Sequence, residues 1–228
     1  MIVRIEYEER QDLKVENISV IGSFNEFDHE EGKMKKENGV WYYEKDLKKG
    51  EYLYRFLIND SIKLNDSTAN IYLINENEEL WSAILIGDRD KRLFNNTQYR
   101  VNIENYQLDN KLNTKIFEES KKIYNIVTDK KAVAKFEFTE ITGIHAVTLI
   151  WYNPWGNVVN ISEGNIYKEI EDESDSATLC FWIDLSAQED LLLGRWKIKL
   201  FINGEFILED IFNVVNKGTY YINNTINK

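Results

Sequence analysis

The segment that most constrains the fold is G-E-Y-L-Y-R-F-L-I at residues 50–58. Four large residues recur at every second position of it: Tyr52, Tyr54, Phe56 and Ile58. Successive side chains of a strand point to opposite faces, so these four share one face and Arg55 lies on the other. A register slip of one residue would bury the guanidinium of Arg55. The segment therefore predicts a β-strand with Tyr54, Phe56 and Ile58 in a core.

The rest of the first 87 residues also favours β structure, with no convincing helix. Turn signals punctuate it at Asn38-Gly39, Lys49-Gly50 and Asn59-Asp60-Ser61. Between them the apolar pattern predicts strands at residues 2–8, 17–24, 40–47, 51–59 and 80–86. We therefore expect residues 1–87 to form one β-sandwich.

The second part of the chain is also predicted to be β, after a charged linker at residues 88–97. The expected strands are 99–104, 132–141, 145–152, 157–162, 177–185, 195–203 and 205–215, with a hairpin turn at Asn203-Gly204. Residues 112–128 fit a short helix or a strand, and we favour a strand near 121–127. About seven short strands separated by turns predict an immunoglobulin-like sandwich over residues 98–228.

Composition limits the classes of function. The chain has 228 residues, 43% of them apolar, which suits two domains. A net charge of -11 without a basic stripe argues against nucleic acid or an anionic membrane as a partner. No apolar run is long enough to span a bilayer, and the N-terminus does not resemble an export signal. We therefore expect a cytoplasmic protein.

Residues that carry catalytic or metal chemistry are sparse. The two histidines, His29 and His145, fall in different predicted domains, and Cys180 lies in an apolar run where a buried, inert thiol is expected. This leaves no nucleophile–base pair, no zinc set and no cofactor motif. The acidic stretch 169–175 lacks the spacing of a calcium loop and is expected to be a solvated hairpin loop. No marked acid pair indicates a glycosidase. We expect a protein that is not an enzyme.

A series of motifs in the first part is similar to a known family. G-S-F-N-E-F at residues 22–27 is followed by G-V-W at 39–41, K-K-G-E-Y-L-Y-R-F at 48–56 and Asn59-Asp60. Over about residues 15–87 the chain resembles the isoamylase-type N-terminal carbohydrate-binding module. It also resembles the glycogen-binding domain of the AMP-activated protein kinase β-subunit. The second part more loosely resembles immunoglobulin-like accessory domains, which implies two early-set, Ig-like β-sandwiches in tandem.

The resemblance also implies a sugar-binding face. The family's first aromatic platform corresponds to Phe27, its basic residue to Arg55 and its second tryptophan to Ile62. Because Ile62 is not aromatic, Trp81 or Tyr72 would have to replace this second platform. The implied function is non-catalytic binding of an α-glucan such as glycogen through Phe27, Arg55 and Trp81. The alternative is a protein-interaction module or scaffold that uses the same sandwich without sugar.

One hairpin offers a possible interface. The segment W-Y-N-P-W-G at residues 151–156 holds the only proline of the chain, which favours a turn. Trp155 is then placed at the tip of that turn. We expect it to fold back on the sandwich or to contact another domain, chain or ligand, with Trp151 beside it.

Overall fold

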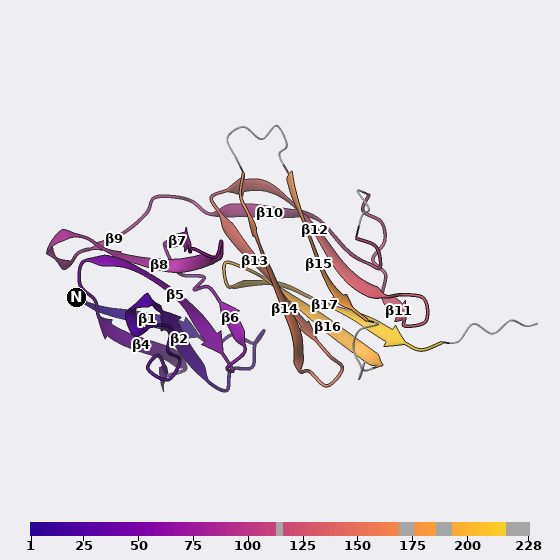
Figure 1. Ribbon diagram of the computed structural model, residues 1–228, viewed down its shortest axis with the longest axis horizontal. Coiled ribbons are helices and arrows are strands. Elements are labelled where there is room, and N and C mark those ends of the chain that lie inside the picture. Colours follow the sequence, from indigo (N-terminus) through magenta and orange to yellow (C-terminus); the bar gives the residue numbers. More distant parts are fainter. Residues whose placement is uncertain (113–115, 169–175, 186–192, 218–228) are drawn as a thin grey trace, which may run out of the picture.

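A computed structural model describes residues 1–112, 116–168, 176–185 and 193–217, and over these residues the protein is all-β. Figure 1 shows its strands in two groups, β1–β9 on one side and β10–β17 on the other. Each of the sheets draws its strands from one group alone.

The first group forms two sheets that enclose an apolar core. One sheet has the strand order β1 (Ile2–Glu8), β4 (Val40–Asp46) and β3 (Lys35–Glu37). The other has the order β2 (Ile18–Gly22), β5 (Gly50–Ile58), β8 (Leu80–Ile86) and β7 (Ile71–Ile74), and β6 (Ile62–Leu64) pairs with β5. Tyr54, Phe56 and Ile58 are buried in the core, so the predicted register of β5 is confirmed.

The second group also forms two sheets. One has the order β10 (Arg100–Asp109), β12 (Lys131–Thr142) and β15 (Ser176–Asp184). The other has the order β11 (Ile123–Asn125), β17 (Glu205–Val215), β16 (Gly194–Ile202), β13 (His145–Tyr152) and β14 (Val158–Ile166). Their facing side chains, including Phe136, Trp196 and Phe212, form a second apolar core.

The predicted long strands are present, but β10 and β14 extend beyond the predicted ends at 104 and 162, to Asp109 and Ile166; β11 lies within the strand expected near 121–127. Four short strands were not predicted: β3, β6, β7 and β9 (Arg92–Leu93). Because β9 pairs with β8, part of the expected linker belongs to a sheet of the first group. The division into domains at 1–87 and 98–228 stays a prediction. The acidic stretch 169–175 lies outside the described residues.

The two groups pack against each other through apolar side chains. Ile150 of β13 and Phe201 of β16 belong to the same buried cluster as the core of the first group. The Asn203–Gly204 turn approaches Asn65 closely, since a β-carbon on Gly204 would lie 1.8 Å from the carbonyl oxygen of Asn65. Polar contacts surround this region, among them an ion pair of 2.9 Å between Arg10 and Glu205. The first group therefore rests on the outer face of the β13–β16 sheet.

Candidate functional site

The G-S-F-N motif builds the loop that carries Phe27. Asn25 is buried, and its side chain accepts a hydrogen bond from Gly22 N (2.9 Å) and donates to Val20 O (2.8 Å) and Asp28 O (3.1 Å). The backbone at Phe27 has φ 61°, and its N–H donates to Gly22 O at 2.9 Å. These bonds flank the short 3-10 helix η1 (Ser23–Asn25) and fix the direction of the loop that follows it.

Phe27 and Trp81 lie together on the outer face of the β5–β8 sheet. The Phe27 side chain is 52% exposed, whereas Trp81 is only 6% exposed. Their rings meet edge to face, with centroids 5.5 Å apart and planes at 81°. The indole N–H of Trp81 donates to Glu79 at 3.0 Å. Trp81 therefore supports the Phe27 ring from below and presents little surface of its own.

Arg55 lies on the same face but is not available to a ligand. It is 3% exposed, and its guanidinium carbon lies 4.9 Å from the centre of the Trp81 ring. The guanidinium donates to Leu80 O and forms a 2.7 Å ion pair with Glu163 of β14. The expectation of an exposed Arg55 is wrong, because Leu80 O and a carboxylate from the second group of strands hold its guanidinium in a buried position.

Ile62 does not occupy an exposed platform either. It pairs with Ile58 across the β5–β6 hairpin, and residues paired in this way share a face. Ile62 is 3% exposed and belongs to the same apolar cluster as Ile150 and Phe201. Ile62 therefore offers no platform to a sugar, and the prediction that it lies on the binding face is wrong, because its side chain packs into that cluster. Tyr72, the other possible replacement platform, is also buried, and its hydroxyl donates to Asp66 O at 2.8 Å.

Two charged residues that the sequence did not single out lie near the Phe27–Trp81 pair. Burial opposes ionisation of Glu79, but hydrogen bonds from Trp81 and Asn75 and the charges of Arg55 and Lys63 outweigh it. The pKa of Glu79 therefore lies below its usual range, and the carboxylate is charged at neutral pH. Lys63 is exposed opposite Leu57, on the face that carries Arg55. Only the folded structure shows that the charges of Glu79 and Lys63 lie near each other.

The two tryptophans of the hairpin at residues 151–156 differ in their exposure. Trp151 is fully buried in the second core, where its ring meets Phe212 at 6.1 Å. Trp151 therefore presents no surface to a partner, because the alternation of β13 directs it inward with Val147 and Leu149. Trp155 is 75% exposed at the tip of the turn, so it does not fold back on the sandwich.

Other residues considered for chemistry have structural roles. The Nε2 atom of His145 lies 3.1 Å from Arg100 O and 3.0 Å from Thr142 O, and burial lowers the pKa of its imidazole. Burial raises the pKa of the Cys180 thiol, which disfavours the nucleophilic thiolate. Within the described part of the chain, no cluster of three or more His, Cys, Asp or Glu side chains is arranged for a metal ion. No helix in the same part is long and apolar enough to cross a membrane.

Solved structures show only distant likeness. An alkylpurine DNA glycosylase of Pseudomonas fluorescens, bound to DNA with an abasic-site analogue, is 9% identical over 52% of this chain and 31% of its own (TM-score 0.34). An immunoglobulin-like protein of Pseudomonas aeruginosa is 12% identical over 52% of this chain and 98% of its own (TM-score 0.33). A β-glucosidase of Listeria innocua in complex with glucose is 8% identical over 55% and 17% (TM-score 0.32). The chain thus spans about a third of the first protein, and scores this low support no argument about function.

Comparison with protein families is more informative. A search of curated proteins gave no match. The family described as the glycogen recognition site of AMP-activated protein kinase matches residues 4–90. This range contains Phe27, Arg55, Ile62 and Trp81 and confirms the resemblance drawn from the motifs. The first part of the chain, residues 4–90, therefore matches the family of carbohydrate-binding modules to which that glycogen recognition site belongs.

Proposed function

We propose that this protein is a non-catalytic module that binds α-glucan through an altered sugar face centred on Phe27. One observation carries the proposal. Phe27 occupies the aromatic position of the family motif, is 52% exposed and is held against Trp81. A flat, exposed ring in a fixed orientation can stack on the apolar C–H face of a glucose unit. The family match to residues 4–90 supports a polysaccharide as the ligand.

The sugar face is altered in the groups that would form hydrogen bonds with sugar hydroxyls. Because Arg55 is 3% exposed and paired with Glu163, its guanidinium is not accessible to sugar hydroxyls. Glu79 and Lys63 take its place in this proposal, since both are charged and lie on the same side of the sheet. A single ring platform should bind more weakly than the two platforms of the family.

The test is the affinity of Phe27→Ala for glycogen and for maltoheptaose, measured by affinity electrophoresis and titration calorimetry. Loss of one well-placed ring should cost about 1–2 kcal/mol, which is roughly a five- to thirtyfold loss of affinity. Phe94→Ala is the matched control, because Phe94 is 69% exposed but lies after β9. The sugar-binding proposal fails if Phe27→Ala and Phe94→Ala bind alike.

A protein-interaction module is the second candidate. The observation that favours it is that two of the family's sugar positions, Arg55 and Ile62, serve contacts inside the chain. Unaltered protein that shows no affinity for either glucan in the same assays would favour this candidate. The same incubations should release no reducing ends, because neither candidate function includes cleavage.

A further inference from the structure

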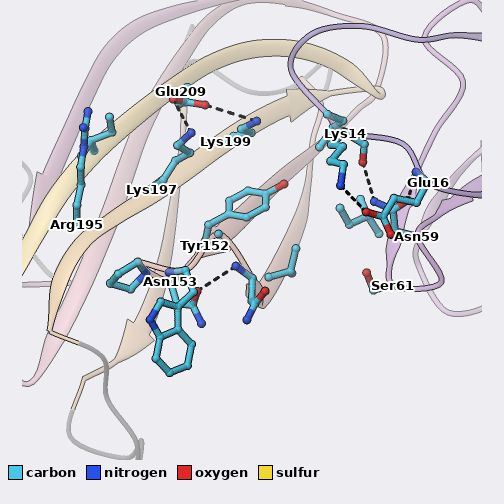
Figure 2. Close-up of a pocket in the computed structure, with 18 residues that line it drawn as sticks. Lys14, Glu16, Asn59, Ser61, Tyr152, Asn153, Arg195, Lys197, Lys199 and Glu209 are labelled. Carbon is cyan, nitrogen blue, oxygen red and sulfur yellow. Dashed lines mark hydrogen bonds and ion pairs between the residues drawn. The ribbon is translucent and has the colours of Figure 1, made fainter.

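A groove runs between the two groups of strands, about 960 Å³ in volume and away from Phe27. Lys14 and Asn59 contribute to one wall, and Arg195, Lys197 and Lys199 of β16 contribute to the other. Figure 2 shows the ring of Tyr152 between these walls.

A rigid turn holds an aromatic ring at the edge of this groove. The Asn153 side chain accepts hydrogen bonds from the backbone N–H groups of Trp155 and Asn157, both at 3.0 Å, and Asn153 N donates to Asn157 O at 3.0 Å. Pro154 packs beside Gly194, where a β-carbon would lie 3.4 Å from the proline ring. The turn is therefore fixed next to Arg195, yet Trp155 stays 75% exposed. The Trp155 ring therefore offers a flat apolar face, in a fixed position, to a ligand in the groove.

The groove is basic in an acidic protein. Four of its lining side chains are cationic and two are carboxylates, Glu16 and Glu209, whereas the whole chain has a net charge of -11. Lys14 pairs with Glu16 at 2.6 Å. Glu209 is shared by Lys197 at 3.0 Å and Lys199 at 3.5 Å. Arg195 forms no ion pair with a described residue, so the β16 wall keeps a positive excess.

We propose that this groove is a second binding site, for a saccharide chain that carries anionic groups such as phosphates. The exposed Trp155 ring supplies a stacking face for a sugar unit, and Arg195 and Lys197 supply charge-assisted hydrogen bonds to the anion. Asn153 and Asn157 also line the groove and add amide groups to it. The site goes beyond the proposed function, because it uses other residues and another ligand chemistry.

An acidic peptide or a nucleic acid is less favoured by the same residues. Either would require more than the two uncompensated cations that the wall offers, against the long-range repulsion of an acidic chain. A saccharide with a few phosphates needs only a few cations and gains the rest of its affinity from stacking. The mixture of one exposed ring, amides and a small positive excess fits that ligand best.

The experiment compares maltoheptaose with the same oligosaccharide phosphorylated on 6-hydroxyl groups, by titration calorimetry on the full chain. The phosphorylated probe should bind roughly tenfold more tightly than the neutral one, and added salt should reduce the difference. Arg195→Gln with Lys197→Gln should abolish this preference, and Trp155→Ala should weaken binding roughly tenfold. Glu209→Gln should act in the opposite direction, because it removes a carboxylate from the β16 wall.

The chain offers a matched pair of controls on the other sheet of the second group. Trp182 of β15 is 46% exposed and lies beside Lys131, at 5.3 Å from ring centre to ammonium nitrogen. Trp182→Ala and Lys131→Gln should leave both affinities unchanged. Phe27→Ala should also leave the preference for the phosphorylated probe unchanged, which separates this site from the glucan face. Equal binding of the two probes would overturn the proposal, and so would equally tight binding of polyglutamate or oligo-dT that survives Trp155→Ala.

Discussion

Ile62 is a packed core position, in the apolar cluster to which both groups of strands contribute. Its side chain is 3% exposed and lies in the cluster with Ile150 and Phe201. A larger aromatic side chain at this position could therefore not extend into solvent. The same burial explains why the family's second platform is absent. A tryptophan at position 62 would have to displace the neighbouring side chains of this cluster.

Ile62→Trp should therefore destabilise the protein and leave glucan affinity no higher. Overpacking a well-packed site typically costs about 1–3 kcal/mol, and urea unfolding followed by fluorescence measures it. Ile74→Trp is the control, because Ile74 is 51% exposed at the end of β7. A gain in glucan affinity for Ile62→Trp without loss of stability would show that the position is open to solvent.

At this scale the sequence predicts a side chain's face better than its surroundings. Alternation in residues 50–58 correctly assigned Arg55 to the face opposite Phe56. It gave no sign of Glu163, which lies 108 positions further along the chain and neutralises the guanidinium. Burial by a distant element leaves no trace in local periodicity.

The Asn203–Gly204 hairpin turn brings the second group of strands close to Asn65 of the first. The predicted turn is present, with positive φ at Asn203 (50°) and Gly204 (82°), as an Asn-Gly hairpin turn requires. Its Asn203 side chain accepts a hydrogen bond from Ala146 N at 2.8 Å, which ties the turn to β13. The turn thus serves the hairpin and the packing against Asn65 together.

Gly204→Ala tests this double role. The added β-carbon meets both the unfavourable φ and the carbonyl oxygen of Asn65, so the free energy of unfolding should fall by roughly 2–4 kcal/mol. Gly39→Ala is a close control: Gly39 has φ 85° but open space around its β position. That change should cost about 1 kcal/mol from backbone strain alone. Equal losses in the two variants would mean that the approach to Asn65 contributes nothing.

Element prediction succeeded where strands are long and failed where they are short. Strands β4, β8, β13 and β17 carry seven or more residues, enough for a period of two to stand out. The missed strands β3, β6, β7 and β9 have two to four residues and exist because a longer neighbour offers hydrogen bonds. Their pairing is decided by the sheet and not by their own sequence.

For the whole molecule, the shared apolar cluster predicts that the two groups of strands unfold together. Phe201 of β16 is 1% exposed in this cluster, and Phe201→Ala should lower the free energy of unfolding by about 3–5 kcal/mol. Denaturant transitions followed by circular dichroism and by tryptophan fluorescence should coincide in the unaltered protein. Phe94→Ala, at an exposed site, should change little. Two well-separated transitions would mean that the groups are energetically independent domains.

The contact between Arg55 and Glu163 has a consequence for the order of events during synthesis. A ribosome adds roughly 5–20 residues per second, so a segment 108 positions downstream arrives on the order of ten seconds later. Until β13, β14 and β16 emerge, the apolar cluster of the first group lacks Ile150 and Phe201, and the guanidinium of Arg55 lacks its carboxylate. The first group of strands therefore leaves the exit tunnel with an exposed apolar surface. A chaperone or a neighbouring nascent chain can bind this surface before the second group of strands has been synthesised.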